Sequence, residues 1–406
     1  MIAGHDIICF ANDWDSDPLS KKHIMVRLAK ANRVLWVDSI GVRRPRATAR
    51  DARRVASKLR RFLCGVRRVE ANIHVLSPLA LPLHDQAWAQ RLNGVIVAES
   101  VRGACRRLGF REPISWVFTP TCANIAGALD EALIVYHCVD EYTEFTGTDA
   151  AAVGSMEREL MNKADLVVVS SAPLLAAKRE ANPYTYLVQH GVDVAHFRQA
   201  CMSTTEMPAD LAAIPRPRLG FHGLIADWID LALLADVARA RPDWSIVLLG
   251  KIDTDPSAVA ALPNVHLMGP RPYGWLPSYC KGFDVALVPF VVNDLTVAAN
   301  PLKVREYLAA GLPVVSTALP EVERLGELVR IARRSDDFVG EIAGLLEEGD
   351  TGPRPWVSRR MDSESWDARV RELSALVVAA LGRARPAEGA AVRSPVGVGS
   401  PRATLR

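Results

Sequence analysis

The sequence predicts an α/β protein made of two doubly wound domains, and three observations lead to this prediction. Short runs of apolar and β-branched residues alternate with helical stretches, which is typical of a parallel sheet covered by helices on both faces. The alternation stops at a polar segment, 197–217, which contains three prolines, and then starts again. A length of 406 residues is sufficient for two such domains.

The first domain is expected to contain seven strands separated by helices. Each candidate strand is a run of about five to seven apolar or β-branched residues, flanked by charge or turn signals. The predicted strands are 5–11, 33–38, 72–77, 114–119, 133–139, 165–170 and 184–188. The clearest helical stretches between them are 19–31, 86–108 and 153–163.

The second domain is expected to contain six strands and to be followed by one long helix. The predicted strands are 218–222, 244–249, 265–268, 283–289, 313–317 and 328–332. We therefore expect a first domain at 1–198 and a second domain at 199–362. Residues 363–382 read as an amphipathic helix that packs back between the domains, with Ser363 or Ser365 as its cap. Residues 383–406 are rich in Pro, Gly, Ala and Arg without periodicity, so a disordered tail is expected.

Composition excludes several classes of protein. A hydrophobic content of 49% and a charged content of 23% exclude a wholly disordered or collagen-like chain. No run of about 18 apolar residues is present, so no membrane-spanning helix is expected. The N-terminus has no basic region followed by an apolar stretch, which predicts a cytoplasmic protein without a secretory signal.

The sequence gives no indication of a metal site. The seven cysteines contain no CxxC pair, and the histidines have no ligand spacing. Two short stretches, 13–15 and 253–255, match the DxD pattern of metal–diphosphate binding. Chance produces so short a pattern often, so we predict that no metal and no cofactor is required.

The most informative stretch is 294–317, Asp-Leu-Thr-Val-Ala-Ala-Asn-Pro-Leu-Lys-Val-Arg-Glu-Tyr-Leu-Ala-Ala-Gly-Leu-Pro-Val-Val-Ser-Thr. A helix is expected to begin there with Asn300 as its N-cap and a proline in the first turn. The free amides around Leu302, with Lys303 in the first turn, would form an anion site suited to a diphosphate. Glu306 follows three residues later on the same face, where it could accept hydrogen bonds from ribose hydroxyls. The alternative is an ordinary capped helix with a Lys–Glu pair.

The run 300–315, Asn-Pro-Leu-Lys-Val-Arg-Glu-Tyr-Leu-Ala-Ala-Gly-Leu-Pro-Val-Val, resembles the donor-site signature of the GT-B glycosyltransferases of the retaining family-four type. The stretches 188–197, 219–225 and 262–273 resemble other segments of that family in the same order. The resemblance is specific over 184–382 and weaker in the first domain. The subgroup is similar to teichuronic-acid and exopolysaccharide glycosyltransferases.

This resemblance implies two Rossmann-like domains that face a cleft, with the acceptor on the first domain and a nucleotide-sugar donor on the second. Lys303 and the amides near Leu302 would hold the donor diphosphate, and Glu306 would bind the ribose. The segment 269–273 would border the base. Gly223 would let its loop approach the phosphates closely.

Two departures from the family pattern affect the donor side. The family usually carries two glutamates eight positions apart, and the position eight before Glu306 is Ala298. The basic residues that usually follow the glycine loop are also missing, because 224–230 contains no Lys or Arg. Lys251 and Arg271 therefore become additional candidates for neutralising the diphosphate.

Acceptor-side candidates follow the strands of the first domain. Asp140 and Glu141 come directly after 133–139, where a carboxylate could orient or deprotonate an acceptor hydroxyl. Asp140 could instead cap its loop. Asp13 lies between a strand and a helix, and its alternative role is to cap that helix. His23, in the helix that follows, could face the cleft.

A basic segment interrupts the first domain. Residues 43–68 carry a net charge of +10, which leaves −7 on the rest of the chain. Apolar residues recur in it at helical spacing, so we predict a basic amphipathic helix that lies on an anionic membrane surface. Arg53, Arg54, Arg60 and Arg61 are its membrane-surface candidates. The alternatives are a solvated loop and, with less support from the acidic remainder of the chain, nucleic-acid binding.

Taken together, these features predict a hexosyl-type glycosyltransferase that uses a nucleotide-diphosphate sugar and retains the anomeric configuration. Asp140, Lys303 and Glu306 are the expected catalytic residues, and the acceptor is expected to be lipid-linked or a polysaccharide. The predicted location is the cytoplasm, peripheral to the inner face of the membrane. Two alternatives are a catalytically silent sugar-nucleotide-binding partner and a GT-B-fold nucleotide-sugar epimerase.

Overall fold

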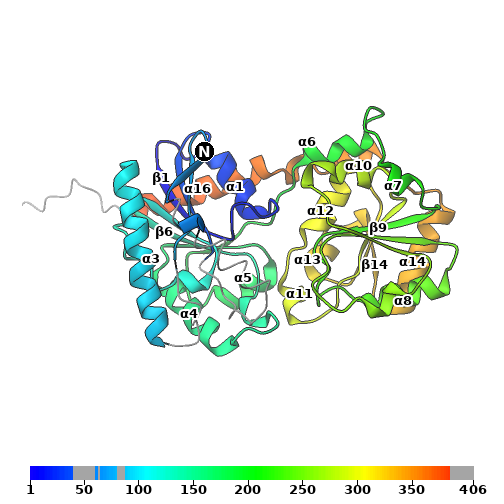
Figure 1. Cartoon of the computed structure of the whole chain (residues 1–406), viewed down its shortest axis with the longest axis horizontal. Helices are drawn as coiled ribbons and strands as arrows, with labels where there is room; N and C mark the ends of the chain where they lie inside the picture. Colours follow the sequence, from blue (N-terminus) through cyan, green and yellow to red (C-terminus); the bar gives the residue numbers. More distant parts are fainter. Residues whose placement is uncertain (40–59, 63–64, 80–86, 385–406) are drawn as a thin grey trace, which may run out of the picture.

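The computed structural model describes residues 1–39, 60–62, 65–79 and 87–384. Two open α/β sheets lie in two bodies joined side by side (Figure 1). Each sheet is parallel apart from one edge strand of the first, and helices pack on its faces. The predicted fold class, two doubly wound domains, is therefore confirmed for this part of the chain.

The first sheet has eight strands in the order β3-β4-β2-β1-β5-β6-β7-β8. Its strands are β1 (Asp6–Phe10), β2 (Arg33–Val37), β3 (Arg67–Glu70), β4 (Ile73–Leu76), β5 (Ile114–Val117), β6 (Leu133–Cys138), β7 (Leu166–Val169) and β8 (Thr185–Leu187). The chain runs outward in both directions from β1 and β5. The carboxyl ends of β1 and β5 therefore flank the point at which an open sheet of this kind binds ligands.

The second sheet has six strands in the order β11-β10-β9-β12-β13-β14, all parallel. Its strands are β9 (Arg218–His222), β10 (Ser245–Leu249), β11 (Val265–Gly269), β12 (Val285–Val288), β13 (Val314–Thr317) and β14 (Val329–Ala332). Here the strand order reverses between β9 and β12. The loops after these two strands therefore occupy the corresponding ligand-binding position.

Helices connect the strands. The α-helices are α1 (Ser20–Leu28), α3 (Ala87–Leu108), α4 (Ala150–Lys163), α5 (Ala172–Lys178), α6 (Val194–Phe197), α7 (Ala209–Ala212), α8 (Leu231–Ala240), α9 (Ser257–Ala260), α10 (Leu276–Cys280), α11 (Asp294–Ala298), α12 (Leu302–Ala309), α13 (Pro320–Glu323), α14 (Ser335–Glu347), α15 (Pro355–Arg359) and α16 (Trp366–Ala384). Short 3₁₀ turns are η1 (Pro120–Cys122), η2 (Tyr142–Glu144), η3 (Arg198–Cys201), η4 (Tyr273–Trp275), η5 (Gly326–Leu328) and η6 (Asp362–Glu364). No helix in the described part of the chain has both the length and the apolar character needed to cross a bilayer.

Strand β3 is not among the predicted strands. Its sequence, Arg-Arg-Val-Glu, has one apolar residue, and none of its side chains is fully buried. It pairs antiparallel with β4 at the edge of the sheet, where one face and one edge meet solvent. Such a strand has no need of the apolar run by which buried parallel strands are recognised.

The two faces of the first sheet alternate along each strand. Ile7 packs toward α1 and α16, whereas its neighbour Ile8 packs toward the cluster that contains α3 and α4. The C-terminal helix α16 lies beside the elements of the first domain (Figure 1). It completes the core of that domain, in which Trp366 and Val370 are buried. Ser365 is one of the two residues predicted to cap this helix. Its Oγ accepts a hydrogen bond from the amide of Ala368 in the first turn of α16, as a cap does. Most of the predicted tail, residues 385–406, lies outside the described residues.

Candidate functional site

The donor-side candidates lie beyond the carboxyl ends of β9 and β12. Helix α12 carries Lys303 and Glu306, and Lys303 Nζ is 2.7 Å from Glu306 Oε2. The Lys303 side chain is 22% exposed and the Glu306 side chain 9% exposed. The predicted pair on one helix face is therefore present, with an ammonium that solvent or a ligand can still reach.

Gly223 lies directly against this pair, in the loop that follows β9. Its φ is +144°, and a Cβ atom at this position would lie 2.9 Å from Lys303 Cε. Only glycine adopts this backbone conformation readily and leaves room for the lysine stem. Two residues that are 80 positions apart in sequence thus form one site.

Helix α12 is held against β9 by a buried tyrosine. The backbone amide of His222 donates to Tyr307 Oη at 2.7 Å, and both residues are buried. Burial lowers the pKa of His222, and the positive charge of Lys303 lowers it further. His222 is therefore neutral beside Glu306, whose carboxylate lies 4.0 Å from the imidazole Nδ1. Lys303 is the counter-ion of Glu306.

Asn300 does not cap the donor helix, so this prediction is wrong. Helix α12 begins at Leu302, and no side chain caps its first turn. Asn300 Nδ2 instead donates to the carbonyl of Ser170 in the first domain at 2.7 Å, and its Oδ1 accepts from Arg305. The side chain of Asn300 is buried at the contact between the domains, and these two hydrogen bonds satisfy its polar atoms there.

The segment expected beside the base brings aromatic rings toward Glu306. The ring of Tyr273 stacks on His196 with centroids 4.4 Å apart. Burial raises the pKa of Tyr273, and the negative charge of Glu306 raises it further, so the phenol stays protonated. Its Oη is buried without a hydrogen-bond partner among the described residues. A buried hydroxyl without a partner is costly, and a ligand that contacted it would remove this cost.

The two additional diphosphate candidates are already paired within the protein. Arg271 donates to Tyr279 Oη, to the carbonyl of Met268 and to Asp210 at 2.6, 2.7 and 2.8 Å. Lys251 forms a surface ion pair of 2.7 Å with Asp253. Arg271 thus has a structural role, and diphosphate binding by either residue stays a prediction.

A buried carboxylate connects the two domains. Glu321, on α13, is fully buried and accepts from the amide of Ala172 at 2.7 Å and from Gln189 Nε2 at 2.5 Å. Ser171 Oγ donates to the carbonyl of Ala298 at 2.5 Å. The loop before α12 therefore contacts the first domain directly. Asn300, in the same domain, also donates to Glu321 at 3.4 Å. Nothing in the local sequence around Glu321 identifies it, because its two shorter hydrogen bonds come from the other domain.

Asp140 lies at the carboxyl end of β6, as predicted, and is half-buried. Desolvation raises its pKa from the ordinary value of 3.8 to about 6, although Lys21 opposes this shift. The carboxylate has no hydrogen-bond partner among the described residues. It does not cap its loop, and it remains free to bind a ligand.

Glu141 has a different role from its neighbour. Its carboxylate is 2.8 Å from Lys178 Nζ, which also pairs with the buried Glu157. Burial alone would lower the pKa of Lys178, but the hydrogen bonds that its ammonium donates to the two glutamates raise it to about 12. Glu141 therefore belongs to an internal ion-pair cluster, which argues against the predicted acceptor-side role.

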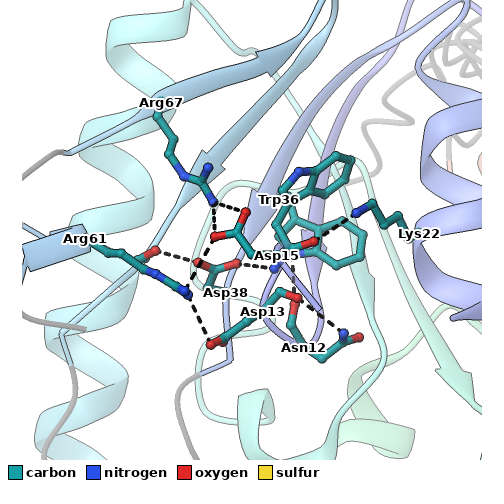
Figure 2. A network of polar contacts seen from close by, with 10 residues as sticks. Asn12, Asp13, Asp15, Lys22, Trp36, Asp38, Arg61 and Arg67 are labelled. Atoms are coloured by element: carbon teal, nitrogen blue, oxygen red, sulfur yellow. Dashed lines mark hydrogen bonds and ion pairs between the residues drawn. The ribbon is translucent and has the colours of Figure 1, made fainter. Parts of the chain in front are cut away.

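The loop after β1 is held by arginines from the basic segment (Figure 2). Arg61 lies 3.3 Å from Asp13 and 3.5 Å from Asp15, and Arg67 lies 3.0 Å from Asp15. Asp13 does not cap α1, whose N-cap is Leu19 without a side-chain bond. Asp13 and Arg61 thus bind each other, and sequence spacing could not have shown this pairing.

The other membrane-surface candidates are less well placed. Arg60 is exposed next to Arg61, and the described residues 60–62 are helical. Arg53 and Arg54 lie outside the described residues.

His23 faces the second domain. Its ring stacks on Trp366 at 5.4 Å and lies 5.8 Å from the ring of Tyr273. Burial, and secondarily Arg27, lowers the pKa of His23 to about 4. The ring is therefore an uncharged part of the contact between the domains, beside the donor-side segment 269–273.

Lys21 is the residue of this site that the sequence does not identify. It lies on α1, with Nζ 5.8 Å from the centroid of the Phe118 ring, and its charge acts on Asp140. Its neighbour Lys22 looks equivalent in sequence but donates to the carbonyl of Trp14 at 3.0 Å. Within the described residues no cluster of His, Cys, Asp and Glu could hold a metal ion.

The second domain of this chain matches a known protein family. Residues 216–348 match the family described as Glycosyl transferases group 1. The putative teichuronic acid biosynthesis glycosyltransferase TuaH of Bacillus subtilis (strain 168) is 29% identical over 187 residues, which are 43% of this chain and 45% of that protein. The match therefore spans less than half the length of the curated relative.

Solved structures resemble the whole described chain. Sucrose-phosphate synthase from Thermosynechococcus elongatus has a TM-score of 0.69 at 13% identity, covering 94% of this chain and all of that one. Anabaena HepE in complex with UDP-glucose has a TM-score of 0.65 at 13% identity, covering 93% and 100%. The catalytic domain of Arabidopsis thaliana Starch Synthase IV, bound to ADP and acarbose, has a TM-score of 0.65 at 10% identity, covering 94% and 100%. At these identities the likeness establishes the GT-B fold.

Proposed function

We propose that this chain, in which residues 216–348 form a glycosyl transferases group 1 domain, is a glycosyltransferase that uses a nucleotide-diphosphate sugar. The second domain would bind the donor and the first the acceptor. The observation that carries this proposal is the Lys303–Glu306 pair, which packs against Gly223 where the order of the second sheet reverses. Ligands of open α/β sheets bind at this position.

Lys303 and Glu306 would bind the donor through their charged groups. The ammonium of Lys303 would neutralise the diphosphate, and it would also stabilise the charge that develops on the leaving group. Glu306 would accept hydrogen bonds from the ribose, and the free Oη of Tyr273 adds a donor on the same side. Structures of the same fold in complex with UDP-glucose, or bound to ADP and acarbose, support this assignment.

The transfer would exchange one bond for another at the anomeric carbon. The bond to the diphosphate oxygen breaks, the bond to the acceptor oxygen forms on the same face of the sugar, and the acceptor proton passes to Asp140. The diphosphate leaves with the nucleotide, its charge neutralised by Lys303. A hexosyl donor and retention of configuration are part of the proposal, because 300–315 resembles retaining enzymes. Contact between the domains would exclude water from the reacting carbon.

The acceptor is proposed to be a lipid-linked sugar or a growing polysaccharide at the inner face of the membrane. The resemblance to TuaH, described as a putative teichuronic acid biosynthesis glycosyltransferase, supports this acceptor class. The basic segment 43–68 would contact the anionic surface. Arg61 forms ion pairs with Asp13 and Asp15. Of these two neighbouring arginines, the exposed Arg60 is therefore the better candidate for contact with the membrane surface.

A thermal-shift screen with nucleoside diphosphates tests the function. A ligand that binds only the folded protein raises its melting temperature, by an amount that grows with ligand concentration over Kd. We expect one nucleoside diphosphate to stabilise the protein clearly. Its monophosphate should stabilise the protein less, because it lacks the second phosphate group that Lys303 would neutralise. The matching nucleotide sugar should then be consumed only when an acceptor is added.

Other outcomes of this screen separate the alternatives. Donor conversion without an acceptor would indicate an epimerase. Nucleotide-sugar binding without transfer to any acceptor would indicate a catalytically silent partner, an alternative motivated by Ala298. Absence of stabilisation by all nucleoside diphosphates would contradict the donor site itself.

Activity is expected to fall on the acid side of about pH 6, because Asp140 must be ionised to accept a proton and its pKa is raised to about 6. Lys21, on α1, is the cation that opposes this shift, and Tyr142, on η2, is the nearby phenol, which stays protonated. The measurement is kcat/KM against pH. Asp140→Asn should lower kcat/KM by about a hundredfold and remove the acid limb.

A stability measurement separates this effect from unfolding. Because the pKa of Asp140 is higher in the folded than in the unfolded chain, ionisation costs folding free energy as pH rises from 3.8 to about 6. Asp140→Asn should therefore be at least as stable as the parent protein at neutral pH. An unchanged acid limb in this variant would show that another group is the base.

A further inference from the structure

The ligand-binding edge of the first sheet carries a lysine and an aspartate that act on each other through their charges without direct contact. Lys21 approaches it from α1, and Asp140 follows β6. Neither side chain forms a hydrogen bond or ion pair with any residue in the described part of the chain. Lys22, by contrast, is bonded to the carbonyl of Trp14 and lies 4.4 Å from its ring.

The surroundings of Lys21 are apolar or uncharged. Its ammonium lies over the ring of Phe118, and Phe118 stacks on His137 with centroids 4.9 Å apart. Burial lowers the pKa of His137 to about 3, and burial raises the pKa of the Cys122 thiol to about 12, so both are neutral. Asp140 is the opposing charge that acts on Lys21. A half-buried ammonium without hydrogen bonds is costly, and a ligand that supplies them removes this cost.

The second domain brings a paired cation near the same place, Arg305, which forms an ion pair of 3.5 Å with Glu364. Leu302, at the start of α12, packs against the core cluster that contains Phe118. Burial lowers the pKa of His190, and the charges of Arg305 and Lys21 both lower it further. The packing of Leu302 against this cluster places the ring over which Lys21 lies near the start of the donor helix.

We propose that Lys21 binds an anionic group of the acceptor, a carboxylate or a phosphate, next to the hydroxyl that Asp140 holds. The acceptor would then be an acidic sugar or a sugar that carries a phosphate, and a neutral sugar would bind poorly. This inference rests on the proposed function, because it assigns the acceptor class of the same site. It adds a residue, Lys21, whose role is to select the acceptor by charge.

Binding of three small probes to the full chain tests the inference. The protein is first saturated with the nucleoside diphosphate that stabilises it most. Dissociation constants are then measured for methyl glucuronide, glucosyl phosphate and the neutral methyl glucoside. At least one anionic probe should bind about tenfold more tightly than methyl glucoside, the effect of a hydrogen bond to a charged group. The carboxylate and phosphate probes distinguish the two sources of the anion.

Lys21→Met keeps an unbranched side chain of similar length and removes its charge. It should abolish the preference for the anionic probe while leaving nucleoside diphosphate affinity unchanged. Lys21→Arg should retain the preference, and Lys30→Met, which changes an exposed lysine just beyond α1, is the matched control. Thermal unfolding of each variant establishes that the fold is intact.

Two results would overturn the inference while nucleotide binding stands. One is equal affinity of the parent protein for anionic and neutral probes, and the other is a preference that survives Lys21→Met. Failure of every nucleoside diphosphate to bind would instead contradict the proposed function, and this inference with it.

Discussion

Lys303→Ala is expected to abolish sugar transfer and leave the protein folded. The variant removes the ammonium that would neutralise the donor diphosphate, and kcat should fall by about a hundredfold to a thousandfold, as when a preorganised charge stabiliser is deleted. It also leaves Glu306, which is 9% exposed, without its counter-ion. The measurement is kcat and KM with the donor identified by thermal shift.

The control for Lys303→Ala is a cation of the same domain on the surface. Arg239 forms an exposed ion pair with Asp236 on α8, and such pairs contribute little to stability. Arg239→Ala should therefore leave both kinetics and melting temperature close to those of the parent protein. If Lys303→Ala retained near-parental kcat, the assignment of the donor site would be wrong.

The sequence predicts the donor side well because its determinants are local. The three-residue spacing of Lys303 and Glu306 places both on one helix face in any α-helix, and the structure joins them at 2.7 Å. The strands of both sheets are predicted because buried parallel strands must be continuously apolar. Strand β3 is missed because it lies at an edge and is charged.

The acceptor side is predicted less well because its partners are distant in sequence. Arg61 meets Asp13 across 48 positions, and Asn300 meets Ser170 across 130. No local pattern encodes such pairs. Lys21 and Lys22 are adjacent and identical in type, and only the packing of α1 against the sheet shows which of them is bonded and which is free.

Ala298 shows how one departure from a family pattern depends on tertiary structure. It is 8% exposed and belongs to the core cluster of the first domain, while its carbonyl accepts from Ser171. A glutamate at this position would place a carboxylate in that apolar contact, where an unpaired charge is costly. In this arrangement of the domains, residue 298 lies in the contact between them, although the resemblance places a glutamate at this position.

Gly250→Ala should both destabilise the second domain and impair donor binding. A Cβ atom at Gly250 would lie 1.7 Å from the carbonyl oxygen of Gly223, a backbone atom that cannot rotate away. The amide of Gly250 also donates to the carbonyl of Gly269 at 3.0 Å, which fixes its position beside β11. The Gly223 loop must therefore move, at a cost of about 1–3 kcal/mol or more for overpacking.

Movement of the Gly223 loop has a functional consequence because Lys303 packs against it. A displaced loop would leave the ammonium without its support, so we expect nucleoside diphosphate affinity to fall together with the free energy of unfolding. Gly340→Ala is the matched control, since Gly340 is exposed within α14 and a Cβ there meets nothing within 4 Å. It should be neutral or raise stability by up to about 1 kcal/mol, because alanine is the better helix former. Denaturant unfolding and nucleotide titration of both variants check this, and parental donor affinity in Gly250→Ala would show that the loop after β9 takes no part in the donor site.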